Sequence, residues 1–413
     1  MTGSLLITNA RILTLAGAHG PRRGAAMGEL AAIERGSVLV RDGRIVEVGP
    51  ETRSDADQTI NAHGRVLMPA FVDCHTHACW AGDRLDEWEQ KQAGASYLDI
   101  LKGGGGIMST VRAVRDASVD ELAELLLTRL DTMLREGTTA CEIKSGYGLS
   151  TESELKMLDA IHRASARWPG RVSPTACIGH AKDADIHNFV EVTINETLGA
   201  VHERYPGITI DAYTEEGAWS VEETVRLFSR ARELGHALRI HADQFNALGM
   251  LDAAISLGAL SVDHLEATSP AKLAQLADSA TMGVMLPCSG FHVDDRYADG
   301  RAFIDAGGAL AIATNANPGS APCFSLPMAI TLGVRKLGIT AAEAINASTA
   351  NGASLLGYED IGTIETGKRA DLVLLRHKDE RQLGYEFGGR HVDLTICHGE
   401  VVFNADQPSI SAT

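Results

Sequence analysis

The pattern of hydrophobic positions divides the chain into two kinds of segment. Near both ends, short runs rich in β-branched residues predict strands, and Asp42-Gly43 between two such runs predicts a tight hairpin turn. These runs cover residues 5–14, 36–49, 370–375 and 392–403. Because the two ends share this pattern, we expect them to form one small β domain, of the β-sandwich type, from residues 1–66 and 364–413. Two independent β appendages are the alternative.

From Met68 onward, short apolar runs alternate with segments of helical periodicity. The runs are typical of strands buried on both faces and cover residues 70–75, 138–144, 173–180, 207–214, 237–241, 260–264, 283–286 and 310–314. Eight strand–helix units in about three hundred residues predict an α/β fold, a TIM (β/α)8 barrel, over residues 67–363. A doubly wound sheet is the alternative, but no glycine-rich phosphate loop follows the first strand.

Helix boundaries are marked by capping residues. Ser118, Thr151 and Ser220 are each followed three residues later by glutamate, which predicts capping boxes at three helix starts. Gly137 and Gly235 stand where C-terminal caps are expected. In the first of these helices, apolar residues at helical spacing predict the buried face: Leu122, Leu125, Leu126, Met133 and Leu134.

Composition narrows the class of protein. The chain has 413 residues, 45% of them hydrophobic and 22% charged, as in globular proteins large enough for a barrel and a second domain. Its formal net charge of -17 argues against nucleic acid or an anionic membrane as the main partner. No signal peptide and no bilayer-length apolar run are evident. Seven scattered cysteines indicate reduced thiols. We therefore expect a cytoplasmic protein with a small-molecule partner.

Unusual polar residues follow the predicted barrel strands. The carboxyl ends of barrel strands face one mouth, and the histidines His75, His77, His180, His241 and His264 stand there. A single buried histidine is more often structural, but five on one rim favour a metal site. His75 and His77 are expected at the end of the first strand, where alternate side chains point to the same side. With His241 they would supply three ligands and leave a position open for water.

This distribution resembles the amidohydrolase superfamily. Members carry His-x-His on strand one, histidines on strands five and six, usually aspartate on strand eight, and a small β domain built from both termini. Within the superfamily the chain is similar to the imidazolonepropionase family from Ile7 to Phe403. The motifs that carry the resemblance are Phe71–His77 with Ala81–Arg84, Gly105–Arg112, Lys144–Leu149, His241–Gln244, Asp263–Glu266 and Asn317–Ser320.

The resemblance implies a reaction. It is the hydrolytic ring opening of 4-imidazolone-5-propanoate to N-formimidoyl-L-glutamate, in histidine degradation. One Zn or Fe ion per chain would lower the pKa of a water so that hydroxide can attack the ring carbonyl. His264 would polarise that carbonyl or move a proton, and Gln244 would hydrogen-bond the ring. Strand four ends without the lysine that bridges two metals in binuclear relatives, so one metal is expected. A homodimer is expected by the same resemblance.

The resemblance also assigns the remaining substrate contacts. Arg84 would pair with the substrate carboxylate, which suits a guanidinium; an ordinary salt bridge is the alternative. The loop after strand eight would present groups to the substrate, or it is a simple Pro-Gly turn. The other residues assigned to substrate binding are Tyr97, Tyr147, His180, Asn317, Gly319 and Ser320.

One residue departs from the family pattern. The family motif Thr-Asp-x-Asn-Pro-Gly reads Thr314-Asn-Ala-Asn-Pro-Gly319 here, so that Asn315 replaces an aspartate that touches the metal and accepts a proton. An amide offers an oxygen to a metal but is a negligible base. Asn315 stays a candidate ligand and catalytic position. We favour an active natural variant with another base such as His264. The alternatives are a disabled enzyme, a substrate-binding relative without turnover, and another cyclic-amide or deaminating amidohydrolase.

Overall fold

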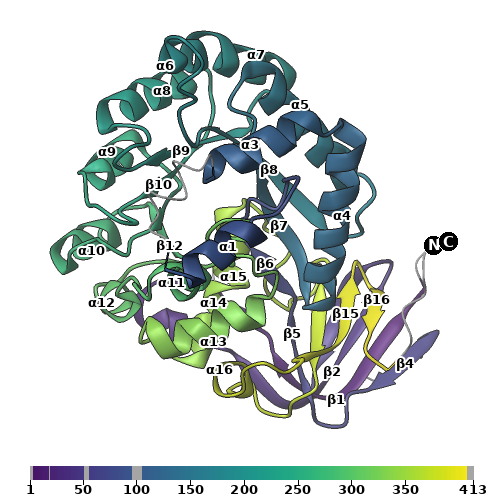
Figure 1. Ribbon diagram of the computed structural model, residues 1–413. Helices are drawn as coiled ribbons and strands as arrows, with labels where there is room; N and C mark the ends of the chain where they lie inside the picture. The colour runs from purple at the N-terminus through teal and green to yellow at the C-terminus, as the bar shows by residue number, and fades with distance from the viewer. Residues whose placement is uncertain (1–2, 18, 51–54, 95–104, 407–413) are drawn as a thin grey trace.

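The computed structural model describes residues 3–17, 19–50, 55–94 and 105–406. Its strands form two separate sheets of eight strands each. Figure 1 shows one sheet ringed by helices and the other, built from the two ends of the chain, packed at one side of the ring.

The first sheet is parallel, and its strands follow one another in space in the order of the sequence. They are β6 (Phe71–Asp73), β7 (Thr138–Lys144), β8 (Arg171–Gly179), β9 (Thr209–Thr214), β10 (Leu238–Ala242), β11 (Ser261–His264), β12 (Met282–Met285) and β13 (Leu310–Ile312). Each strand overlaps one of the eight predicted runs. The prediction of a (β/α)8 barrel is confirmed.

The barrel closes between its first and last strands, just beyond the ends of both. The Asn315 amide donates to the His75 carbonyl at 3.1 Å, and the His77 amide donates to the Ala316 carbonyl at 2.9 Å. These backbone bonds join the segment after β6 to the segment after β13. The seam of the barrel therefore runs through residues that the sequence assigned to the metal site.

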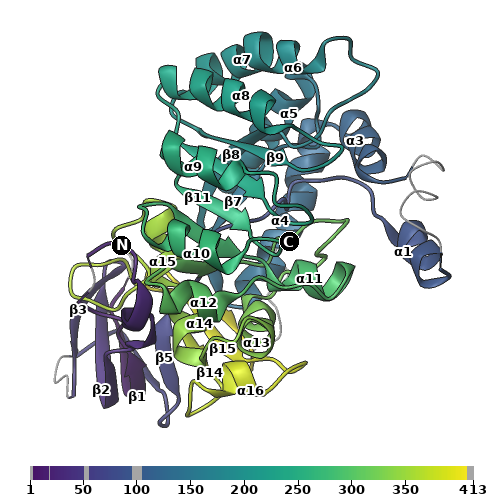
Figure 2. The same cartoon turned by 90° about the vertical axis from the view of Figure 1, so that its left-hand side faces the viewer.

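Helices surround the barrel (Figure 1). They are α3 (Ile107–Asp116), α4 (Val119–Arg135), α5 (Thr151–Ser165), α6 (Phe189–Val192), α7 (Leu198–Arg204), α8 (Val221–Glu233), α9 (Met250–Leu257), α10 (Pro270–Ala277), α11 (Pro287–Val293), α12 (Gly300–Asp305), α13 (Leu326–Lys336), α14 (Ala341–Ala347) and α15 (Ala350–Leu355), with α16 (Gln382–Tyr385) beyond them. By contrast, α1 (Leu85–Gln92) has no buried residue and projects away from the barrel in Figure 2. In the described part of the chain, no helix is long and apolar enough to cross a membrane.

The predicted capping boxes are confirmed at Ser118 and Ser220, where side chain and backbone exchange hydrogen bonds with the third helical residue. The prediction at Thr151 is wrong. The cap of that helix is Ser150, and the carboxylate of Glu154 turns away from the helix start toward the preceding loop. A loop with unsatisfied N–H groups competes successfully for that carboxylate.

The predicted buried face of α4 is largely confirmed. Leu122, Leu126, Met133 and Leu134 are buried, whereas Leu125 is 39% exposed and its assignment to the face is wrong. The stripe that meets the barrel is therefore narrower than the sequence suggested. The glycine that follows this helix has φ of 93°, and its counterpart after α8 has 83°, as the predicted caps require.

The second sheet combines both ends of the chain. Its strands are β1 (Leu5–Leu13), β2 (Ala32–Arg41), β3 (Arg44–Gly49), β4 (Gln58–Asn61), β5 (Val66–Pro69), β14 (Leu372–Leu375), β15 (Val392–Cys397) and β16 (Glu400–Asn404). Figure 2 shows β1, β2 and β3 side by side at one end of the molecule. One apolar core unites residues from the start, such as Ile7, with Leu372 and Ile396 from the end. The predicted single β domain from both termini is confirmed.

The hairpin predicted at Asp42-Gly43 is also confirmed. Arg41 pairs with Arg44 across the turn, and both central residues have positive φ, 46° and 76°. At the other boundary, only Ala70 separates β5 in this sheet from β6 in the barrel. The chain thus passes from one sheet to the other within a single residue.

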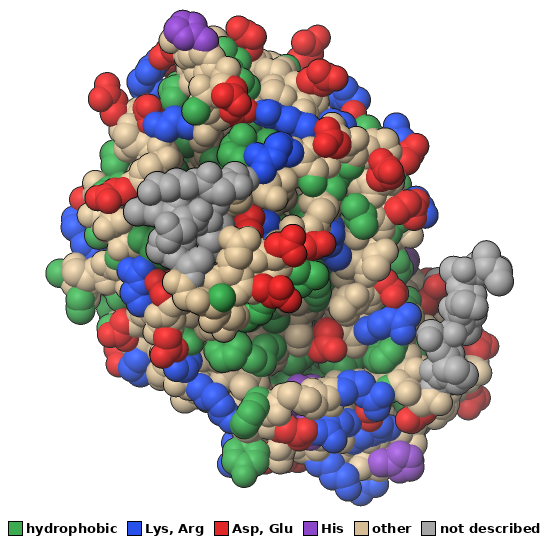
Figure 3. Space-filling model, in the orientation of Figure 1, with side chains coloured by type: hydrophobic (Ala, Val, Ile, Leu, Met, Phe, Trp, Pro, Cys, Tyr) green, Lys and Arg blue, Asp and Glu red, His purple; other side chains and the backbone are tan. Residues whose placement is uncertain are grey.

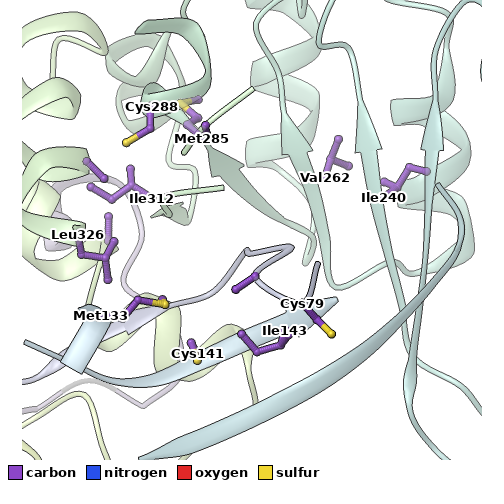
Figure 4. Close-up of a cluster of buried hydrophobic side chains, with 14 of the residues drawn as sticks. Cys79, Met133, Cys141, Ile143, Ile240, Val262, Met285, Cys288, Ile312 and Leu326 are labelled. Atoms are coloured by element: carbon purple, nitrogen blue, oxygen red, sulfur yellow. The ribbon is translucent and has the colours of Figure 1, made fainter. Parts of the chain in front are cut away.

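The main apolar core lies outside the barrel sheet, against the helices. Figure 4 shows Ile143, Ile240, Val262 and Ile312 from four barrel strands within this core. Successive side chains of a strand point to opposite faces, so the residues on either side of Ile240 point into the barrel. The expectation of strands buried on both faces is confirmed, but the inner face of several strands is charged instead of apolar.

Candidate metal and substrate site

The three histidines expected to bind a metal lie together in the barrel mouth. Ring centroids are 4.5 Å apart for His75 and His241, 5.1 Å for His77 and His241, and 5.4 Å for His75 and His77. A ligand nitrogen of each lies within 4.8 Å of the others, and all three side chains are buried. β6 ends at Asp73, so the predicted placement of His75 and His77 at a strand end is wrong. They lie in the segment that closes the barrel.

The hydrogen bonds of the rings fit a metal site. His75 Nδ1 lies 2.6 Å from Asp263 Oδ2, and His241 Nδ1 lies 2.9 Å from Asp211 Oδ1. A carboxylate on Nδ1 fixes the tautomer that leaves the Nε2 lone pair free for a metal. The Nε2 atoms of His77 and His241 are 2.9 Å apart, and His75 Nε2 is buried without a hydrogen-bond partner among the described residues. The donor set therefore suits one cation.

The surroundings of His75 and His77 disfavour their protonated forms. Burial, together with the charge of Lys144, lowers the pKa of His75 well below its ordinary value. Burial and the neighbouring His180 do the same to the pKa of His77. Neutral imidazole is the form that coordinates a metal, so His75 and His77 can bind an ion without first losing a proton.

A second group of possible ligands, Cys177, Asp211 and His241, overlaps the first. Asp211 already accepts from His241 and from Lys144, and burial raises the pKa of the Cys177 thiol well above its ordinary value. A protonated thiol and an occupied carboxylate are poor ligands. The histidine triad is the better metal site.

Asn315 lies beside the triad at the barrel seam. Its side chain is buried, and its Oδ1 atom has no hydrogen-bond partner in the described part of the chain, while Nδ2 lies 3.5 Å from Ser289 Oγ. Its φ of 55° is a left-handed conformation that asparagine and aspartate tolerate better than most residues. An unpaired carbonyl oxygen is thus available at the strand-eight position.

Three further predicted residues line the same mouth. His180 stacks on His77 with centroids 4.6 Å apart, and burial lowers the pKa of His180 to about 4. Tyr147 lies 5.2 Å from the His180 ring. His264 lies 5.7 Å from His241, with its Nδ1 3.2 Å from Glu266 Oε1. These rings form an aromatic wall next to the triad.

Gln244 has a partner that the sequence reasoning did not assign. The Tyr213 hydroxyl donates to Gln244 Oε1 at 2.9 Å, and the Tyr213 ring lies 6.0 Å from His241. Tyr213 follows Asp211 by two positions on β9, which places both on the inner face. That spacing was the signal available in the sequence.

Arg84 lies beside the loop that follows β13. A Cβ atom on Gly319 would be 3.5 Å from Arg84 Nη1. The guanidinium pairs with Glu87, its Nη1 lies 3.4 Å from Thr110 Oγ1, and its Nε is buried without a partner among the described residues. Arg84 therefore lies between the loop after β13 and the carboxylate of Glu87. Tyr97, another predicted contact, lies outside the described residues.

The loop after β13 is shaped by Asn317. Its Oδ1 accepts from the backbone amides of Gly319 at 2.9 Å and Ser320 at 2.7 Å, and its Nδ2 donates to the Asn315 carbonyl at 2.6 Å. The side chain is thus engaged within its own loop and fixes the position of Asn315 and Ser320. Together with the bridge between Asn317 and Ala321, these bonds close a turn through Pro318 and Gly319, as the alternative of a Pro-Gly turn predicted.

Glu154 fixes the loop that carries Tyr147. Its carboxylate accepts from the amides of Gly146 at 2.9 Å, Gly148 at 2.8 Å and Leu149 at 2.8 Å. The side chain is buried, and burial raises its pKa against the opposing effect of these hydrogen bonds. In the sequence, Glu154 stands three residues after Thr151, and this spacing indicated a capping box instead of contacts with the loop.

Beneath the histidines lies a buried group of charged residues that the sequence reasoning also missed. It consists of Glu142 and Lys144 on β7, Asp211 on β9, Arg239 on β10 and Asp263 on β11. The signal in the sequence was a basic residue inside each of two apolar runs, Lys144 and Arg239, because buried cations need buried carboxylates as partners.

Comparisons with known proteins agree with this geometry. The model of the amidohydrolase family matches residues 66–402. The chain is 44% identical to an imidazolonepropionase of Herpetosiphon aurantiacus over 96% of each chain. It is 43% identical to that of Deinococcus radiodurans, over 90% of this chain and 93% of the relative.

Solved structures share the fold at low identity. A triazine hydrolase variant has a TM-score of 0.77 at 17% identity, covering 99% of this chain and 96% of its own. E. coli guanine deaminase has a TM-score of 0.74 at 15% identity, covering 97% of this chain and 99% of its own. The chain belongs to the amidohydrolase family, in the group of the imidazolonepropionases.

Proposed function

We propose that the protein opens the ring of 4-imidazolone-5-propanoate by hydrolysis and releases N-formimidoyl-L-glutamate, a step of histidine degradation. The observation that carries this proposal is the buried histidine triad, with the Nδ1 atoms of His75 and His241 held by carboxylates, in a chain 44% identical to an imidazolonepropionase. The arrangement suits the activation of water for attack on a cyclic amide.

His75, His77, His241 and the amide oxygen of Asn315 would hold one Zn or Fe ion. Such an ion, when bound, lowers the pKa of water and polarises a carbonyl group. The protein's own contribution is to bury the three imidazoles together and to orient His75 and His241 through Asp263 and Asp211. The unpaired Asn315 Oδ1 supports its place in this set.

The other residues would bind the substrate and move protons. His264, close to His241 and paired with Glu266, would act as the acid or base at the ring, since the amide of Asn315 has no basic character. Gln244, held by Tyr213, would hydrogen-bond the ring. Arg84 would pair with the carboxylate tail. The residues proposed to complete the substrate site are Tyr97, Tyr147, His180, Asn317, Gly319 and Ser320.

The test is the hydrolysis rate of 4-imidazolone-5-propanoate by metal-loaded protein, measured beside Asn315→Asp. Rapid turnover by the unchanged chain supports the proposal, with the proton handled away from Asn315. An inactive chain that Asn315→Asp restores identifies a disabled version of the same enzyme. A chain that stays inactive in both forms, while binding the substrate, overturns the proposed activity in favour of a binding protein.

A second candidate is another cyclic-amide or deaminating amidohydrolase, because the triazine hydrolase and guanine deaminase share the fold. Arg84 distinguishes the two candidates. With a carboxylated substrate, Arg84→Ala is expected to raise KM about 10- to 100-fold, as loss of a charged contact of about 1.5–3 kcal/mol requires. The control is Arg163→Ala, which removes an exposed guanidinium paired with Asp120 on the surface. An unchanged KM in Arg84→Ala contradicts the assignment.

We further propose a cytoplasmic homodimer. Seven free cysteines, six of them buried, support a reducing compartment. The dimer rests on family resemblance, and the mass of the protein in solution tests it. On the face in Figure 3, acidic and basic side chains are interspersed, which supports a small-molecule partner over a nucleic acid.

A further inference from the structure

The buried charged residues form one continuous path between two of the metal-site histidines. Positive and negative groups alternate along it, and every link is a direct contact. The links are His75 to Asp263 (2.6 Å), Asp263 to Arg239 (2.6 Å), Arg239 to Glu142 (2.8 Å), Glu142 to Lys144 (2.9 Å), Lys144 to Asp211 (2.5 Å) and Asp211 to His241 (2.9 Å). We call these five residues, Glu142, Lys144, Asp211, Arg239 and Asp263, the charge chain.

We propose that Glu142, the middle of the charge chain, is a positioning residue that sets the orientation of His75 and His241 together and thereby the affinity of the metal site. This inference rests on the metal site of the proposed function. Glu142 contacts neither histidine. It acts through Lys144 on one side and Arg239 on the other.

The burial of the charge chain makes each link strong. All five side chains are at most 2% exposed, so water does not screen their charges. Burial and Arg239 disfavour the charged form of Lys144, but Asp211 and Glu142 outweigh them and raise its pKa above the ordinary value. Burial opposes the ionised form of Asp211 as well, yet His241 and Lys144 hold the pKa of Asp211 well below its usual range.

Arg239 completes the same picture. Burial disfavours its charge, but Asp263 and Glu142 raise the pKa of Arg239 above its ordinary value. The charge chain thus holds three carboxylates against two cations. The net negative charge beneath the histidines complements a metal cation above them.

A purely structural role accounts poorly for this arrangement. Buried ion pairs are often no more stabilising than apolar residues of similar volume, because desolvation offsets their attraction. A carboxylate that orients a ligating histidine, by contrast, commonly changes metal affinity 10- to 100-fold. In this protein two such carboxylates, Asp211 and Asp263, are joined through Glu142, so a displacement at one histidine is transmitted to the other.

The first test is the metal affinity of Glu142→Gln, which keeps the volume and removes the charge. Zn²⁺ affinity is measured by competition with a chromophoric chelator, on folded protein verified by circular dichroism. We expect binding about 10- to 100-fold weaker than in the unchanged protein, with activity recovering as Zn²⁺ is added. Equal affinity overturns the proposal.

The matched control is Glu154→Gln, the other fully buried glutamate near the mouth. Among the described residues, Glu154 bonds to the loop amides and to Ser145 but to none of the five residues of the charge chain, so its replacement is expected to leave Zn²⁺ affinity unchanged and to raise KM. If Glu154→Gln weakens Zn²⁺ binding as much as Glu142→Gln does, the effect belongs to any buried carboxylate and the proposal is wrong.

A milder variant keeps the proposal testable if Glu142→Gln fails to fold. Thr175 Oγ1 donates to Glu142 Oε1 at 2.6 Å, and Thr175→Val removes this bond while it retains all five charges. A weakening of Zn²⁺ binding of about threefold or more is expected, because the Glu142 carboxylate loses one of the hydrogen bonds that fix its position. Unchanged Zn²⁺ affinity in a folded Thr175→Val protein overturns the proposal.

A double-mutant cycle tests the coupling itself. Asp211→Asn and Asp263→Asn each release one histidine, and the double variant is expected to deviate from the product of the two effects on Zn²⁺ affinity by about threefold or more. The deviation should vanish in the Glu142→Gln background. Independent effects with Glu142 intact contradict the coupling. A chain that binds Zn²⁺ but does not hydrolyse the imidazolone overturns the proposed activity alone and leaves this inference intact.

Discussion

The two eight-stranded sheets of this chain are built on opposite principles. The β domain encloses an apolar core, in which Ile7, Leu372 and Ile396 meet from both ends of the sequence. The barrel packs its main apolar core on the outside, against the helices, and its inner face carries Glu142, Lys144 and their partners beside a smaller apolar cluster. One sheet is stabilised mainly by burial from water, whereas the other contains charges whose burial is costly in free energy.

The difference shows where the orientation of side chains must be fixed in this molecule. An apolar core tolerates changes of shape as long as volume is kept, because its contacts have no direction. A histidine that presents Nε2 to a metal must be held in one orientation. A hydrogen bond between its Nδ1 atom and a carboxylate fixes that orientation, because such a bond is directional. The buried charges of the barrel interior therefore fix side-chain orientation at a cost in folding free energy. The apolar core of the β domain does not carry this cost.

The largest expected effect follows from breaking the charge chain at a cation. Arg239→Met should destabilise the fold by about 3–5 kcal/mol, because Glu142 and Asp263 would remain buried without their shared partner. Chemical denaturation measures the change, and Arg163→Met at an exposed pair serves as the control. A stable Arg239→Met protein with unchanged metal affinity would contradict the claim that buried charges distinguish the barrel from the β domain.

An apolar truncation in the β domain should have a somewhat smaller effect and a different signature. Leu372→Ala is expected to cost about 2–4 kcal/mol through lost burial and a residual cavity. The fall in stability should leave kcat/KM and Zn²⁺ affinity unchanged at 25 °C. The partly exposed Leu125 provides the control, since Leu125→Ala should be nearly neutral. Loss of Zn²⁺ affinity in Leu372→Ala would mean that the two sheets are coupled.

The smallest expected effect is a pH dependence near the β domain. Burial lowers the pKa of His391 from an ordinary 6.5 to about 4, and His377 Nε2 lies 3.1 Å from its Nδ1. Between these pH values the unfolded chain binds more protons than the folded one, so the contribution of His391 is complete above pH 6.5 and is lost as the pH falls toward 4. His391→Gln should reduce the acid loss of stability by about 1–2 kcal/mol, measured by denaturation at several pH values. An unchanged slope would exclude His391 as its source.

The sequence predicted those features that depend on local periodicity and on strand count. The eight barrel strands, the Asp42-Gly43 hairpin and the caps at Ser118 and Ser220 all follow from residues close together in the chain. His75, His77 and His241 were brought together by the rule that barrel strands end at one mouth, and their rings indeed lie within 5.4 Å of one another.

The features that escaped prediction depend on partners distant in the sequence. Glu154 has the spacing of a capping box, and only the fold shows that three loop amides claim its carboxylate. The charge chain joins residues from four strands, and its pairing cannot be read from any one of them. The end of β6 was not predicted correctly either. The backbone of His75 and His77 forms hydrogen bonds with the segment after β13, and not with a neighbouring strand of a regular ladder.

The seam has a consequence for how the protein assembles. His75 and Asn315 are 240 positions apart in the chain, and they become neighbours only when the first and last barrel strands meet. Contacts between such distant segments carry a large loop-closure cost and are expected late in folding. During synthesis, the ligand set that we propose, which includes Asn315, is complete only after the eighth strand has left the ribosome. The proposed metal site therefore forms in full only when the barrel closes.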